Sequence, residues 1–70
     1  MKITYDETVD ILTIRLREGD YAESDEVVPG IIVDFDQQGK PMALEILDAK
    51  LLLGQMDRVM LEYARVPQVA

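Results

Sequence analysis

Residues 31–47 read IIVDFDQQGKPMALEIL, and this stretch decides the fold. Its two arms, residues 31–36 and 41–47, place apolar side chains at alternate positions, as half-buried strands do. Gln38-Gly39 between them predicts a two-residue hairpin loop, because Gly readily takes the positive φ that such a loop requires. The predicted cross-strand pairs are Phe35 with Met42, Val33 with Leu44 and Ile31 with Ile46.

The same two-residue period appears at the N-terminus. Residues 2–5 alternate polar with apolar side chains, and residues 11–16 place Leu12, Ile14 and Leu16 on one face. The segment between them is polar at both ends, and its Asp side chains can bond to nearby backbone N–H groups and hold a turn. We therefore expect a second, N-terminal hairpin.

The connection that follows is strongly acidic. Its acids are Glu18, Asp20, Glu23, Asp25 and Glu26, and no basic residue lies among them. Self-repulsion should keep this stretch extended and hydrated, so we interpret it as a loop that leads into an edge strand. Pro29 cannot donate a ladder hydrogen bond, and Gly30 allows the chain to turn.

A short helix is predicted after the hairpin of residues 31–47. Asp48 is its expected N-cap, with the carboxylate accepting from the first free N–H groups, and Gly54 is its expected end. Residues 55–66 are compatible with a strand or with a helix; we favour a strand. The predicted fold is thus α+β: one small domain over residues 1–70, a mostly antiparallel sheet of four or five strands built from two hairpins, and one short helix after the fourth strand.

Composition restricts the classes of protein that remain. Apolar residues make up 49% of the chain, too many for a disordered segment, and no apolar run approaches the roughly 20 residues of a membrane helix. The net charge of −7 disfavours direct nucleic-acid binding, and the N-terminus does not resemble a secretory signal, so we expect a cytoplasmic protein. A 70-residue domain without Cys or His has neither disulfide nor zinc for support, which favours a homodimer.

Carboxylates provide the only candidates for a metal or catalytic site. Asp34, Asp36 and Glu45, with Gln38 and Gly39, match the spacing of a calcium-binding loop, but the hairpin is the wrong context for that loop. The predicted register also staggers Asp34 and Glu45. Asp36 is better explained as a turn residue, and we expect no catalytic residues and no cofactor.

Two stretches are candidate partner surfaces. The acidic run Glu18, Asp20, Glu23, Asp25 and Glu26 could attract a basic protein, although charges on an edge strand also discourage edge-to-edge aggregation. The second stretch is apolar and contains Met56, Met60, Leu61 and Tyr63. It is compatible with a subunit contact or with completion of the monomer core.

Several spaced motifs resemble a family of small prokaryotic proteins, domain of unknown function 2283. They are Met1-Lys2-Ile3, Tyr5-Asp6, Asp10, the alternation of Leu12, Ile14 and Leu16, then Gly30, Asp34, Asp36, Gly39 and Glu45-Ile46-Leu47-Asp48-Ala49. The resemblance departs at Gln38, where an acidic residue or Asn is usual, and does not extend beyond Leu53. It implies no established activity; some members are encoded beside small toxin-like proteins, as an antitoxin would be.

These observations lead to one principal hypothesis. The chain is expected to be a non-enzymatic, acidic protein-interaction module that forms a homodimer, with an antitoxin-like role toward a basic partner. The alternative is a small metal-binding protein or enzyme that uses the carboxylates of the second hairpin.

Overall fold

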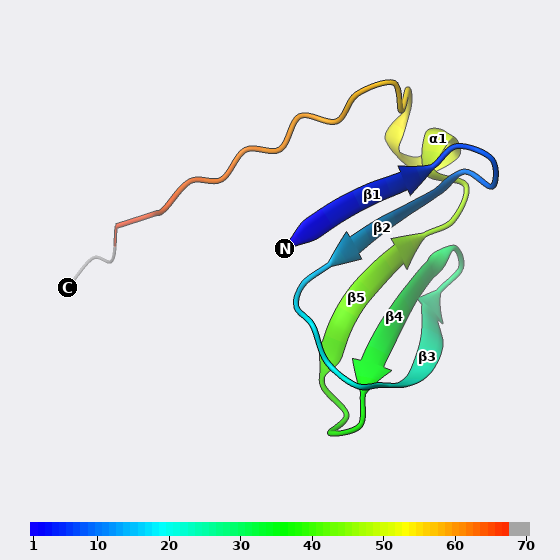
Figure 1. Cartoon of the computed structure of the whole chain (residues 1–70). Coiled ribbons are helices and arrows are strands. Elements are labelled where there is room, and N and C mark those ends of the chain that lie inside the picture. Colours follow the sequence, from blue (N-terminus) through cyan, green and yellow to red (C-terminus); the bar gives the residue numbers. More distant parts are fainter. Residues whose placement is uncertain (68–70) are drawn as a thin grey trace.

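The computed structural model describes residues 1–67 and contains five strands and one helix (Figure 1). All paired strands are antiparallel, and their order across the sheet is β1-β2-β5-β4-β3. The prediction of an α+β fold dominated by an antiparallel sheet is confirmed. The elements are β1 (Lys2–Asp6), β2 (Ile11–Arg15), β3 (Tyr21–Val28), β4 (Ile31–Asp36), β5 (Pro41–Ile46) and α1 (Ala49–Leu53).

Two details of the predicted architecture are wrong. The helix follows the fifth strand, not the fourth, and the sheet is not a pair of hairpins. It joins the hairpin β1–β2 to a three-stranded meander β3–β4–β5 through pairing of β2 with β5. The expected edge strand is β3, and it begins earlier than expected because most of the acidic residues belong to it. Its charged side chains are all exposed, so they remain hydrated while the backbone pairs with β4.

The register between β4 and β5 agrees with the prediction except near the turn. Ile31 pairs with Ile46 and Val33 with Leu44, as predicted, whereas Phe35 pairs with Pro41 and not with Met42. A shift in register between Asp34 and Phe35 accounts for the difference. The hydrogen bonds of the connecting turn enclose three residues and not two, and the shift in register accommodates the additional residue.

The turn between β4 and β5 has three residues, 37–39. The Gly39 N–H donates to the Asp36 carbonyl at 3.0 Å, and the Asp36 N–H donates to the Lys40 carbonyl at 2.9 Å. Gly39 has a φ of 77°, so the expectation that Gly supplies a positive φ is confirmed. This pattern is a turn followed by a left-handed glycine, the common three-residue hairpin connection.

The sheet has one apolar and one polar face. Directly paired residues lie on the same face, so the pairings define what we call the apolar face. Its residues are Ile3, Tyr5, Leu12, Ile14, Ile31, Val33, Leu44 and Ile46. The opposite, polar face includes Lys2, Thr4, Thr13, Ser24, Asp34 and Glu45.

The first amides of α1 are bound by Asp10 and not by Asp48. The Asp10 carbonyl accepts from the Ala49 N–H at 3.1 Å, and its carboxylate accepts from the Lys50 N–H at 3.2 and 3.3 Å. Asp48 occupies the N-cap position but makes no side-chain cap bond. Its φ of 49° is left-handed, whereas a capping side chain usually extends from a β-region backbone. The predicted capping role of Asp48 is therefore wrong.

A small core lies where α1 meets one end of the sheet. Leu12, Ala49 and Met56 are buried together, and Tyr5 and Ile46 are among the residues packed against them. Gly54 ends the helix as predicted, with a φ of 87° and its N–H donating to the Lys50 carbonyl. Within residues 1–67 the core contains no large side chain that is completely buried.

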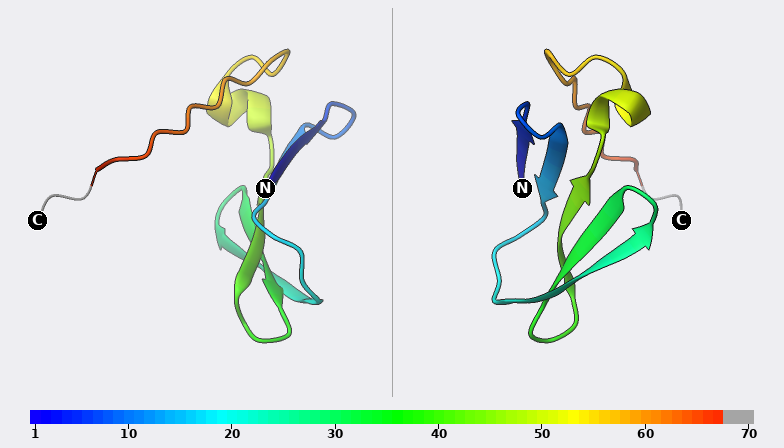
Figure 2. Two further views of the ribbon diagram at one scale, coloured as in Figure 1. Left: turned by 60° about the vertical axis from the view of Figure 1, so that its left-hand side comes forward. Right: turned by 90° about the vertical axis from the view of Figure 1, so that its right-hand side faces the viewer.

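Residues 55–67 follow the helix without forming a helix or strand, so neither alternative predicted for residues 55–66 is found. This segment extends away from the sheet (Figure 1 and the left view of Figure 2). Its large apolar side chains after Met56 are exposed; they are Val59, Met60, Leu61, Tyr63 and Val66. Within the described part of the chain, no helix has the length and apolar character to cross a membrane.

Candidate functional site

The predicted acidic partner surface lies along one edge of the sheet. Glu18 and Asp20 precede β3, while Glu23, Asp25 and Glu26 belong to it, and all five are exposed. Glu26 also accepts a hydrogen bond from the Gly30 N–H at 3.2 Å, which supports the turn into β4. Three of the five acids thus lie on the edge strand β3, and two lie in the connection before it.

A row of polar side chains crosses the polar face from β3 to β5. The Tyr21 and Ser24 hydroxyls lie 2.7 Å apart, and Ser24 Oγ donates to Asp34 Oδ1 at 2.6 Å. Burial raises the pKa of Glu45, and a hydrogen bond with Asp34 and the negative charge of Asp34 raise it further. The predicted stagger is confirmed, since Asp34 pairs with Ala43 and Glu45 with Ile32. Asp34 still acts on Glu45 because diagonal neighbours on one face are within reach of long side chains.

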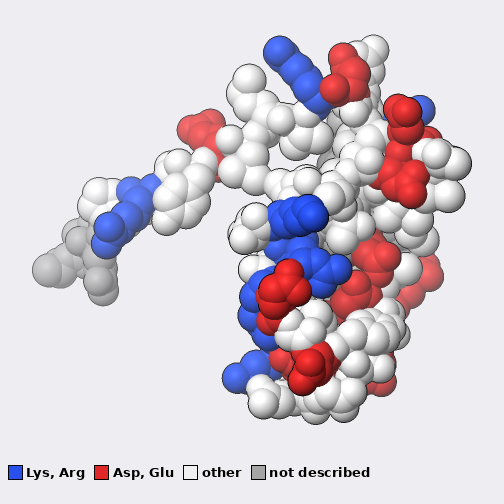
Figure 3. Space-filling model, viewed as in Figure 1, with Lys and Arg blue, Asp and Glu red and all other residues white. Residues whose placement is uncertain are grey.

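Figure 3 shows how charge is distributed over the face seen in Figure 1. Across the body of the sheet, basic side chains gather on the β1–β2 side and acidic side chains dominate the β4–β3 side. Arg15 on β2 opposes the effect of Asp34 by lowering the pKa of Glu45.

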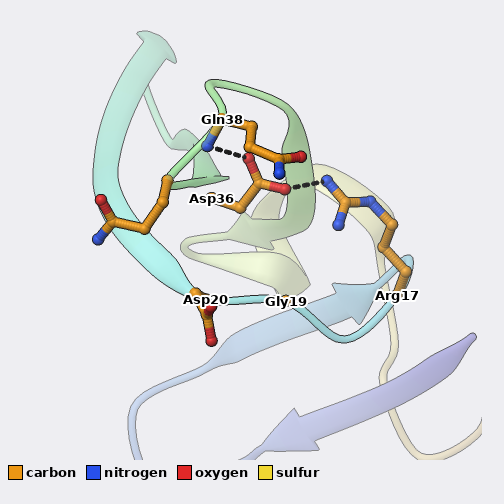
Figure 4. Close-up of a pocket in the computed structure, with 6 residues that line it drawn as sticks. Arg17, Gly19, Asp20, Asp36 and Gln38 are labelled. Carbon is orange, nitrogen blue, oxygen red and sulfur yellow. Dashed lines mark hydrogen bonds and ion pairs between the residues drawn. The ribbon is translucent and has the colours of Figure 1, made fainter.

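Asp36 is the one buried charged residue among those described, and its bonds are structural. One carboxylate oxygen accepts from the Gln38 and Lys40 N–H groups, both at 2.9 Å, and the other accepts from Arg17 Nη2 at 2.6 Å (Figure 4). The Lys40 amide and the Arg17 guanidinium lower the pKa of Asp36 to about 2, with a further contribution from the Gln38 amide. Asp36 is consequently ionised at neutral pH, and its predicted role as a turn residue is confirmed.

Asp36 borders a pocket of about 210 Å³, which is also lined by Arg17, Gly19, Asp20 and Gln38. Figure 4 shows the Arg17 guanidinium and the Gln38 backbone N–H bonded to the two oxygens of Asp36. Both oxygens of Asp36 already accept hydrogen bonds from the protein. We therefore interpret the pocket as a surface depression beside the β4–β5 turn, which Asp36 and Arg17 stabilise.

The three carboxylates proposed for a metal do not meet at one point. Asp34 and Glu45 interact on the polar face, whereas Asp36 bonds to the turn and to Arg17. Over residues 1–67 there is no group of three or more Asp, Glu, His or Cys side chains that could hold a metal ion. What remains is a pair of neighbouring carboxylates, Asp34 and Glu45, on the polar face.

The second predicted partner surface is divided by the fold. Met56 is 9% exposed and belongs to the core of its own chain, so it is not available to a partner. Met60 and Tyr63 are 83% and 84% exposed. The predicted subunit contact is thereby restricted to the segment that follows Met56.

Half of the residues of the apolar face have no covering layer; they are Ile14, Ile31, Val33 and Leu44. Figure 2 shows a twisted, single-layer sheet with α1 at one end only. Ile14, Val33 and Leu44 are partly exposed at the centre of this face. They are not among the residues that pack against the small core, and each is only half-buried in the isolated chain.

Two interacting groups were not predicted. Asp10 joins the first hairpin to α1, and the Tyr5 hydroxyl donates to its carboxylate at 2.6 Å, which raises the pKa of Tyr5 to about 12. The Arg17–Asp36 ion pair joins the chain after β2 to the β4–β5 turn. Tyr5, Asp10 and Ala49 are all among the residues that carry the family resemblance. Their joint occurrence was the one feature of the sequence that could have indicated the contacts of Asp10.

A family model described as "Protein of unknown function (DUF2283)" matches residues 2–50. The match spans all five strands and the beginning of α1, including the Tyr5–Asp10 contact. No curated protein and no solved structure matches the chain. The matched residues are more than half of the 70 present, and the chain therefore belongs to the family of proteins of unknown function DUF2283.

Proposed function

We propose that this protein is a non-enzymatic interaction module that acts as a homodimer, in which two copies pack their apolar faces together. The uncovered apolar face carries this proposal. A sheet with one apolar face normally packs against a second layer, and here α1 covers only one end. A second copy supplies a layer of the same shape and chemistry, since two sheets can pack with their inner side chains interdigitated.

The exposed area supports an interface of ordinary size. A compact monomer of 7.9 kDa exposes about 4,400 Å² by the usual scaling with mass, whereas this chain exposes 5889 Å². The excess of about 1,500 Å² by that scaling is larger than the roughly 800 Å² that each partner buries in a standard interface. The chain therefore has enough surplus surface for a stable dimer.

The absence of an enzymatic role is part of the same proposal. The chain contains neither Cys nor His, which supply most nucleophiles and general bases near neutral pH. Its one Ser, Ser24, donates its hydroxyl to Asp34 within the row on the polar face. Asp36 is engaged by the turn and by Arg17. These contacts support a structural use of the polar residues.

Sedimentation velocity of the unmodified chain tests the homodimer. We expect a single species with twice the mass of the chain at micromolar concentration, dissociating on dilution, because burial of the apolar face drives association. A monomer that persists to the highest micromolar concentrations contradicts the proposal.

We further propose that the acidic edge of the dimer binds a basic protein partner, in an antitoxin-like role. The net charge of −7 and the exposure of Glu23 and Asp25 on β3 support a partner of opposite charge. Coexpression with the product of the neighbouring open reading frame should give a copurifying complex. Replacing Glu23 and Asp25 by Gln and Asn should weaken that complex, with Glu7→Gln as the control; failure to copurify contradicts the role.

A further inference from the structure

The segment after Met56 has the composition of a strand but no strand partner in the described chain. Val59, Leu61 and Tyr63 alternate with Met60 and Glu62, which is the two-residue period of a half-buried strand. Residues 55–67 form no regular element and leave Tyr63 84% exposed. An extended segment of this kind is stabilised when its backbone groups pair with the edge of a sheet.

The sheet offers two edges, β1 and β3, and they differ in chemistry. Along β3, Glu23 and Asp25 lie on the same side as the apolar face, and Ser24 and Glu26 lie on the other side. Apolar side chains of an added strand would meet carboxylates there. Along β1 the alternation is favourable, since Ile3 and Tyr5 belong to the apolar face.

One antiparallel register between β1 and the segment matches every position except Met60, which lies opposite Thr4 on the polar face. With Leu61 opposite Ile3, the apolar side chains continue the apolar face, and Val59 lies opposite Tyr5. On the polar face the same register brings opposite charges together at both ends, namely Glu62 with Lys2 and Arg58 with Asp6. A shift by two residues in either direction loses both charge pairs, so the register is specific.

We propose that residues 58–63 of one copy add to β1 of a second copy as a sixth strand, and that the two copies exchange these segments reciprocally. This inference rests on the proposed homodimer and names a contact within it. The segment leaves the α1 end and extends away from the sheet of its own chain (Figure 1 and the left view of Figure 2). Donation to a second copy pairs the backbone of the segment and widens the apolar face of the acceptor beside Ile3.

A charge exchange between two chains tests the inference. Lys2→Glu places like charges opposite Glu62, and Glu62→Lys places like charges opposite Lys2. Each variant alone should dissociate about tenfold more readily than the unmodified dimer, since the pair is lost twice in a symmetric dimer. A mixture of the two variants should form a heterodimer as tight as the unmodified protein, because both interfaces then contain one Lys and one Glu.

The mixture distinguishes exchange from folding of the segment onto its own β1. If the segment paired within one chain, mixing would restore nothing, whereas the chain carrying both substitutions would recover; that result would overturn the inference. Lys40→Glu changes the charge equally at an exposed residue beside the β4–β5 turn, and should leave dissociation unchanged. Circular dichroism of each variant reports whether the sheet is retained.

Removal of residues 57–70 separates this inference from the proposed homodimer. The shortened chain retains Met56 and the core, and should dissociate at least tenfold more readily than the full chain. A shortened chain that dimerises as tightly as the full chain would refute strand donation and leave the homodimer intact. A full-length chain that is monomeric would refute both.

Discussion

Leu44→Lys should weaken self-association by about a hundredfold, or about 2.7 kcal/mol, while the sheet remains folded. Leu44 lies at the centre of the uncovered apolar face, paired with Ile14 on one side and Val33 on the other. In the dimer an ammonium at this position would lose its hydration without a partner, which is costly. In the monomer the lysine stem can lie over Ile14 while its charge remains in water. Sedimentation equilibrium measures the dissociation constant.

Thr13→Lys is the matched control for this substitution. Thr13 lies on β2 beside Ile14 but faces the polar side, opposite Glu45. The same lysine there should leave the dissociation constant unchanged within about threefold, because Glu45 offers a favourable neighbour. Equal effects of the two lysines would show that neither face is a specific interface. A folded Leu44→Lys chain that dimerises normally would exclude packing through the apolar face.

Asp10→Gly should lower the free energy of unfolding by about 2 kcal/mol. Its carboxylate accepts from the Tyr5 hydroxyl and from the Lys50 N–H, so the substitution leaves two donors without their partner. Glycine is chosen because Asp10 has a φ of 57°, which glycine adopts without strain. Urea unfolding at one fixed protein concentration provides the measurement, since association contributes to the apparent stability.

Asp48→Gly is the corresponding control because Asp48 has a similar left-handed backbone but no side-chain bond to α1. Its replacement should change the free energy of unfolding by less than about 0.5 kcal/mol. A larger loss at Asp48 than at Asp10 would show that the helix is capped locally, as its sequence suggests. The pair of variants therefore compares a distant cap with an adjacent one.

The strands that alternate apolar and polar residues were predictable, and the contacts between distant segments were not. The pairs Ile31–Ile46 and Val33–Leu44 follow from side-chain period alone, because a slip by one residue would turn the apolar set to the other face. The capping interaction joins Asp10 to Lys50, forty residues apart. No local pattern distinguishes it from the ordinary expectation that Asp48 caps the helix that it precedes.

The turn between β4 and β5 shows a second kind of limit. Gly39 was correctly identified as the residue with positive φ, but the number of residues in the loop was not. Asp36 decides between the two loops, since its carboxylate binds the Gln38 and Lys40 amides and stabilises the longer turn. Its second oxygen is occupied by Arg17, a contact from another part of the chain.

Only part of the candidate partner surface could be predicted. Met56, Met60 and Tyr63 have similar apolar character in sequence, yet Met56 joins the core and the other two are exposed. Burial of Met56 depends on Leu12 and Ala49, which are distant in the chain or on another element. The residues after Met56 alternate as a strand does, but the sequence does not reveal their partner, because the strand that we propose for them belongs to a second copy of the chain.

The two edge strands of the sheet, β1 and β3, differ in charge, and this difference limits the size of the complexes that the proposed strand exchange can form. If both edges of the sheet accepted a new strand, further copies could add without limit and form a fibre. The carboxylates along β3 repel the β3 strand of another copy, and they cannot pack against the apolar side chains of residues 58–63. In the proposed dimer, growth therefore stops after one reciprocal exchange, because the carboxylates of β3 leave β1 as the acceptor edge.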